Sequence, residues 1–248
     1  MTTGHETRTV DVRERGNDKN GQPIALDRRL FMQVLGFTCS VEQRLDSAAV
    51  ALSDALNASG LPGVVYEDLN HPRGFAMVTL TEDPADFVEK LRPRLAESTC
   101  SGLEPRPELS MLGRTYSTGF EQDLEYWLLR RPRETVLNNA WPWAIWYPLR
   151  RKGGFERLDP KEKGGVMREH GGVGRAYGES DLAHDVRLAC HGLDQSDNDF
   201  VIGLVGANLH PLSHVVQAMR ATRQTAEFME KLGPFFVGHA LFRSAGKQ

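Results

Sequence analysis

A histidine on the apolar face of a predicted helix is the first residue whose type and position could do chemistry. His170 shares that face with Val166, Val173 and Tyr177 in segment 160–177, so its imidazole is expected to point into the protein. A histidine in this setting is more often a core residue with hydrogen-bonded ring nitrogens. A neutral imidazole nitrogen is also a common metal ligand, so the pattern alone leaves both interpretations open.

Two predicted strands carry the other candidate groups. Tyr147 lies in strand 143–149 and is followed by the cations Arg150, Arg151 and Lys152. Segment 185–191 alternates between an apolar face, which we expect to pack against helices, and a polar face made of Asp185, Arg187, Ala189 and His191. A polar face lines a cavity or meets water, and the pattern favours water. Tyr147 could equally pack beside its strand neighbours, and a basic run is usually a solvated surface.

Composition narrows the class of protein. The 248 residues include 30 Lys and Arg against 33 Asp and Glu, and a net charge of −3 gives no general reason to expect nucleic-acid binding. The three cysteines are odd in number and lack CxxC spacing, which argues against a disulfide framework and a structural zinc site. Reduced thiols, the lack of a leader-like N-terminus and the lack of a long apolar run predict a soluble cytoplasmic protein without a membrane span.

Periodicity divides the chain into an arm and two similar halves. Residues 1–27 are polar and aperiodic, and we interpret them as a flexible arm. The halves, 28–120 and 121–248, have the same order of strand, helix, two strands, helix, strand. The elements expected are strands 31–39, 64–67, 74–80 and 109–117 with helices 41–59 and 84–97, then helices 122–129, 160–177 and 209–232 with strands 143–149, 186–193, 200–205 and 235–242. This order predicts an α+β fold in which tandem ferredoxin-like repeats form a domain of the dimeric-α+β-barrel type.

The second half also contains an ordered series of motifs. A Tyr-Pro-hydrophobic strand with basic residues comes first, then Phe155, the acidic start of a helix at Asp159 and Glu162, and a His-Gly pair at 170–171. Together with Gly192-Leu193-Asp194 and the Gly-Pro-Phe-Phe run at 233–236, this series resembles the chlorite dismutase family of haem proteins. It is most similar to the coproheme decarboxylase branch, over residues 144–241, as a divergent member.

The resemblance implies roles for these residues. His170 would be the axial iron ligand of haem b or ferric coproheme. Family members orient that histidine with a Glu on the last long helix, where this chain has Gln224 or a neighbouring Arg. Tyr147 corresponds to the tyrosine that carries an oxidising radical to a substrate propionate. Arg150, Arg151, Lys152 and Arg114 would supply cations for the propionates.

The resemblance also identifies a position on the distal side of the haem that distinguishes two activities within the family. The position that holds an Arg in chlorite-degrading members falls on Asp185, or on Ala183 if a longer loop shifts the register. A carboxylate there would repel a chlorine oxyanion, which argues against chlorite chemistry. Asp185 could instead be a general base for peroxide if it points inward, or a strand-end carboxylate paired with Arg187.

The expected function is therefore a haem-binding oxidoreductase, a hydrogen-peroxide-dependent coproheme decarboxylase that forms haem b. The alternatives are a haem peroxidase-like enzyme of the same fold and a non-catalytic haem carrier or sensor. The resemblance further implies a homo-oligomer, specifically a homopentamer, whose partners are the porphyrin and peroxide.

Overall fold

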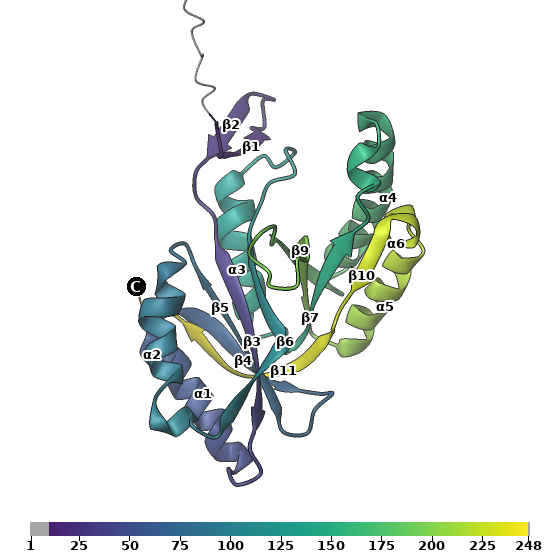
Figure 1. Ribbon diagram of the computed structural model, residues 1–248. Helices are drawn as coiled ribbons and strands as arrows, with labels where there is room; N and C mark the ends of the chain where they lie inside the picture. Colours follow the sequence, from purple (N-terminus) through teal and green to yellow (C-terminus); the bar gives the residue numbers. More distant parts are fainter. Residues whose placement is uncertain (1–9, 248) are drawn as a thin grey trace, which may run out of the picture.

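The computed structural model describes residues 10–247 and confirms the α+β class with two ferredoxin-like halves (Figure 1). The first half contains β3 (Phe31–Cys39), α1 (Leu45–Ser59), β4 (Pro62–Asp68), β5 (Gly74–Thr81), the π-helical turn η1 (Phe87–Leu91), α2 (Arg92–Leu95), the 3₁₀ turn η2 (Ser98–Cys100) and β6 (Leu103–Arg114). The second contains the π-helical turn η3 (Tyr126–Arg130), α3 (Arg131–Leu137), β7 (Trp143–Arg151), the 3₁₀ turn η4 (Phe155–Arg157), α4 (Pro160–Glu179), β8 (His184–Ala189), β9 (Phe200–Gly206), α5 (Leu209–Arg220), α6 (Arg223–Phe228), β10 (Met229–Leu232) and β11 (Phe236–Ala245).

A nine-stranded antiparallel sheet joins the two halves. Its order is β10-β7-β11-β4-β5-β3-β6-β8-β9, and an additional pairing of β7 with β9 closes it into a barrel. The barrel interior is apolar and includes the fully buried Met32, Tyr66, Trp146 and Phe236. Within the described residues the short strand β10, which pairs only with β7, remains as an edge of the sheet.

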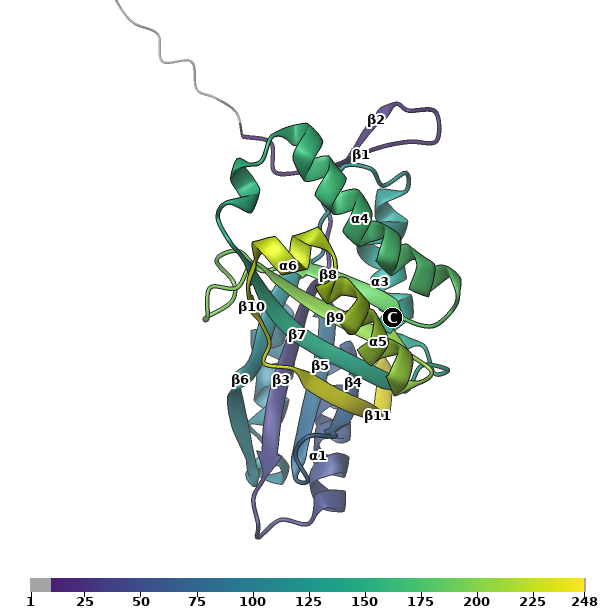
Figure 2. The same cartoon turned by 90° about the vertical axis from the view of Figure 1, so that its right-hand side faces the viewer.

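The two outer faces of the sheet are covered by helices from the two halves. Figure 1 shows α1 and α2 on one side of the barrel and α4, α5 and α6 on the other, and Figure 2 shows α5 beside β7 and β9, with α6 and α4 above it. Apolar side chains fill both interfaces, with Leu52 and Phe75 in the first and Tyr147 and Leu212 in the second. Of the described helices, none is long and apolar enough to cross a membrane.

The helix that carries His170 begins as the sequence predicts. The Asp159 carboxylate accepts hydrogen bonds from the backbone N–H groups of Lys161 and Glu162, each at 2.9 Å. Such a cap satisfies two donors at the helix start and stabilises it by about 1 kcal/mol. Helix α4 then runs through residue 179, which confirms the predicted element.

Several predicted elements differ from the structure. The helix expected over 84–97 is divided into η1 and α2, and the strand expected over 186–193 ends at Ala189. The helix expected over 209–232 ends at Arg220, a second helix starts after Thr222, and Met229–Leu232 is a strand that pairs with β7. The helix expected over 122–129 instead continues through Pro132 to Leu137, because the proline sits in the first turn of α3, where no intrahelical N–H bond is needed. Within the arm predicted for residues 1–27, β1 (Glu14–Asn17) and β2 (Pro23–Leu26) form an antiparallel hairpin; residues 1–9 lie outside the described part.

Candidate functional site

The predicted catalytic groups lie in rows on one face of the sheet. Antiparallel partners point to the same side of a sheet, so the register of β7, β9 and β8 fixes which side chains are neighbours. The three rows are Ile145–Leu204–Asp185, Tyr147–Ile202–Arg187 and Leu149–Phe200–Ala189. Tyr147 and Asp185, which are far apart in sequence, therefore lie on one face in adjacent rows.

Helix α4 lies over this face and brings His170 to it. Val173 and Tyr177, one and two turns further along, pack into the apolar cluster that contains Tyr147. His170 is half-buried, and this burial lowers the pKa of its imidazole to about 4, with the charges of Arg151 and Arg187 acting in the same direction. The ring is consequently neutral at neutral pH, which is the form that binds a metal.

The residue in contact with His170 is a threonine. His170 Nδ1 lies 3.3 Å from Thr222 Oγ1, at the start of α6. Gln224, which was expected to replace the family's glutamate, is buried, and its Oε1 has no hydrogen-bond partner among the described residues. The structure therefore brings Thr222 and not Gln224 to the imidazole.

Tyr147 is held as a protonated phenol on the same face. Its ring stacks on Phe235 with 4.6 Å between centroids, and its side chain is only 7% exposed. Burial raises the pKa of the phenol well above its usual value, and the charge of Asp185 raises it further. The hydroxyl proton is thus retained at neutral pH.

Asp185 points into the same site but is bound by two arginines. Arg131 Nη2 lies 2.6 Å from Asp185 Oδ1, Arg187 Nε lies 3.1 Å from Oδ2, and Arg131 Nη1 donates to the Asp185 carbonyl at 2.9 Å. Burial raises the pKa of Asp185, but the two guanidinium charges outweigh it and bring the pKa below its ordinary value. Ala183, the other candidate for this position, is buried in the same apolar cluster and contributes only a methyl group.

The three cations after Tyr147 have different environments. The Arg151 guanidinium lies between the rings of Phe155 and Phe200, 4.5 Å from each centroid, and within the described chain its Nε has no acceptor and the residue no ion-pair partner. Arg150 instead donates to the Ser196 carbonyl and faces Glu230, while the exposed Lys152 donates to the Glu227 carbonyl at 2.9 Å. Of the run, only Arg151 presents an unpaired cation to the site.

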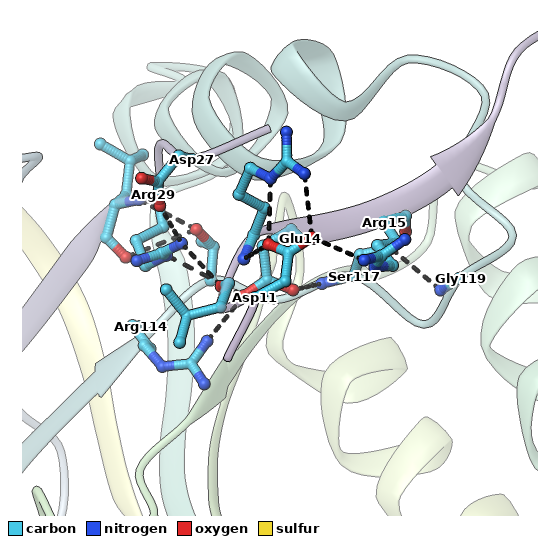
Figure 3. Close-up of polar contacts among 12 residues, drawn as sticks. Asp11, Glu14, Arg15, Asp27, Arg29, Arg114, Ser117 and Gly119 are labelled. Carbon is cyan, nitrogen blue, oxygen red and sulfur yellow. Dashed lines mark hydrogen bonds and ion pairs between the residues drawn. The ribbon is translucent and has the colours of Figure 1, made fainter. Parts of the chain in front are cut away.

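Arg114 is engaged by the N-terminal hairpin (Figure 3). Its position on β6 pairs with Ala189, which places it at the end of the third row. Its Nη1 lies 2.8 Å from Glu14 Oε1, and the same carboxylate accepts from the Ser117 backbone N–H at 2.9 Å. Arg114 is therefore close to the site but paired with Glu14 in this structure.

Sequence reasoning did not assign a site role to four residues that the structure places here. Arg187 had been recognised on the polar face and as a possible partner of Asp185, and the structure confirms that pairing. Tyr116 packs on Phe200 with ring centroids 5.5 Å apart, and Arg131 stacks on Trp127 at 4.9 Å. Arg131 lies on α3, and no motif in the sequence around it indicates a role at this site. Thr222, the fourth, did carry a local signal, because a threonine before an amphipathic segment is a typical N-cap.

The family and the fold can now be compared with known proteins. The family model described as chlorite dismutase matches residues 74–241, more than half of the chain. No curated protein matches the sequence. A haem-binding protein from Thermus thermophilus has 20% sequence identity and a TM-score of 0.68 over 86% of this chain and 92% of that one.

Chlorite dismutase from Candidatus Nitrospira defluvii in complex with imidazole has a TM-score of 0.68 at 14% identity, covering 87% of this chain and 92% of that one. At these identities the structures show a shared fold, while the family model supplies the sequence relationship. The chain belongs to the chlorite dismutase family.

Proposed function

We propose that this protein is a coproheme decarboxylase, which uses hydrogen peroxide to convert two propionates of ferric coproheme to the vinyl groups of haem b. The observation that carries the proposal is the position of Tyr147. It is a protonated phenol in the row that also holds Arg187, on the face that His170 approaches. In this proposal Tyr147 is the redox-active phenol, His170 the axial ligand and the arginines of this face the anion-binding groups.

The residues present fit an iron porphyrin. Within residues 10–247, no group of three or more His, Cys, Asp or Glu side chains could hold a bare metal ion. Porphyrin iron brings four ligands of its own and needs one axial side chain, which His170 would supply. Helix α4 also has only Val166 fully buried, which leaves most of a 20-residue helix without tight packing against the protein. The similar haem-binding protein from Thermus thermophilus also supports the proposal that this site holds an iron porphyrin.

The charge of the site suits a polyanionic substrate. Arg131 and Arg187 both pair with the carboxylate of Asp185, and Arg151 has no ion-pair partner within the described chain. Asp185 and Arg187 have side chains 37% exposed, so these charges remain open to solvent and to a ligand. We assign Arg151 the most direct propionate contact because its guanidinium is unpaired, and Arg131 and Arg187 supporting contacts.

When bound, the iron porphyrin and peroxide supply the oxidising power. Tyr147 then removes a hydrogen atom from the propionate β-carbon after losing its own phenolic hydrogen. For each turnover one peroxide is reduced to two waters, and one propionic acid group becomes a vinyl group and carbon dioxide. Asp185 is ionised and can accept a proton from peroxide, but its lowered pKa makes it a weak base. We therefore assign it mainly to holding Arg131 and Arg187 in place.

The experiment incubates purified protein with ferric coproheme and hydrogen peroxide and follows the porphyrin by mass spectrometry. Stepwise loss of two carbon dioxide equivalents supports the decarboxylase. Oxidation of an added phenol without decarboxylation would indicate a peroxidase-like enzyme, and spectral binding without turnover would indicate a carrier or sensor. By resemblance to the family we also propose a cytoplasmic homopentamer, which light scattering tests as five times the chain mass.

A further inference from the structure

The hydrogen bonds of the Thr222 hydroxyl determine which nitrogen of the His170 ring carries the proton. Thr222 is 3% exposed, and its Oγ1 lies 2.7 Å from the Met219 carbonyl and 3.3 Å from His170 Nδ1. A hydroxyl has one hydrogen, and a carbonyl can only accept, so the Thr222 hydrogen goes to Met219. Toward His170 the hydroxyl can therefore only accept.

We propose that Thr222 is the positioning residue that fixes His170 in the Nδ1–H tautomer and aims Nε2, with its free lone pair, at the metal side of the site. Because Oγ1 accepts, Nδ1 must carry the proton, and Nε2 is left unprotonated. This inference rests on the proposed haem-binding function for the purpose of Nε2, whereas the tautomer itself is a property of the chain without haem. Metal-ligating histidines generally need such a partner on the second nitrogen.

The acidic side chains near Thr222 and His170 are paired with other groups. Glu169 accepts from the Arg223 backbone N–H at 3.1 Å, and Glu162 and Glu227 each pair with the Arg223 guanidinium at 2.8 Å. Within the described chain, the hydroxyl of Thr222 is the hydrogen-bond partner recorded for the His170 ring. Unlike a carboxylate, a neutral hydroxyl does not draw the proton from Nδ1, so the ligand should donate less electron density to iron.

The first test is ¹⁵N NMR of histidine-labelled protein without haem at neutral pH. We expect the native His170 signals to show a protonated Nδ1 and an unprotonated Nε2, and Thr222→Ser to keep this pattern. Thr222→Val should lose it and give a tautomer mixture. The control is Thr225→Val, because the Thr225 hydroxyl lies 3.4 Å from Thr222 Oγ1 on the same short helix and has no contact with His170. A native-like tautomer in Thr222→Val would overturn the proposal.

The second test uses haem-loaded protein and the iron–histidine stretching frequency in resonance Raman spectra of the ferrous state. We expect Thr222→Val to lower this frequency and Thr222→Asp to raise it, and we expect Thr222→Val to weaken haem affinity on the order of 10- to 100-fold. Equal frequencies in all three proteins would overturn the role of Thr222. Failure to bind haem at all would instead contradict the proposed function, and the haem-free NMR result would still decide the tautomer. Far-UV circular dichroism checks that each variant is folded.

Discussion

Arg151→Met should separate substrate binding from folding. In the structure the guanidinium lies between two aromatic rings and has no ion-pair partner within the described chain, and burial lowers its pKa. If it binds a propionate, the variant loses one charge-assisted hydrogen bond, about 1.5–3 kcal/mol. The dissociation constant for coproheme should then rise about 10- to 140-fold.

The same substitution should leave stability nearly unchanged. Two cation–π contacts of about 0.5–1 kcal/mol each are lost, and the desolvation cost of a half-buried cation is relieved in return. The assay is a Soret titration with coproheme and with its tetramethyl ester, alongside thermal unfolding of the haem-free protein. The matched control is Lys152→Met, since Lys152 is exposed and bonded to the Glu227 carbonyl. Equal affinities of native and Arg151→Met protein for coproheme, or an equal loss for the ester, would refute the propionate contact.

Three further outcomes follow from the same site. Tyr147→Phe should bind coproheme within about tenfold of the native protein, because one hydroxyl contributes about 1 kcal/mol, yet form no haem b by mass spectrometry; a rate within a few fold of native would make Tyr147 a packing residue. Chlorite should give no sustained oxygen release at an oxygen electrode, because the Asp185 carboxylate neutralises Arg187 and repels an anion; steady turnover would contradict this. The haem-free protein should lose stability as pH falls from about 6.5 to about 4, because the pKa of His170 is lowered on folding and the unfolded chain takes up the proton first. His170→Ala should flatten that part of the pH profile of urea unfolding, and an unchanged slope would count against the burial of the imidazole.

The local parts of the fold could be predicted from the sequence. Asp159 caps α4 because its carboxylate and the following proline act within one helical turn, and such signals are readable without tertiary context. The alternation in 185–191 likewise predicted that Val186 and Leu188 are buried, but the expected partner was wrong, because these side chains face the barrel interior and the helices cover the opposite face. The polar residues of the same strand face the site, whereas the pattern alone favoured water.

Other features depend on contacts between distant segments. Met229–Leu232 continues the apolar pattern of a helix, but its backbone completes the edge of β7, and periodicity does not reveal pairing partners. Arg114 pairs with Glu14 across 100 positions, and Arg131 on α3 reaches Asp185 on β8. Thr222 was missed because the segment was read as one uninterrupted helix, which concealed its position as an N-cap.

The most direct test of the account is whether His170 holds the iron. Ferrous protein loaded with haem should show an iron–histidine stretch in its resonance Raman spectrum that shifts on substitution of ⁵⁴Fe for ⁵⁶Fe. We predict that His170→Ala abolishes this band and that His191→Ala, which removes an exposed histidine beside Phe200 at the margin of the same face, leaves it unchanged. A native band in folded His170→Ala would contradict the assignment of the haem site.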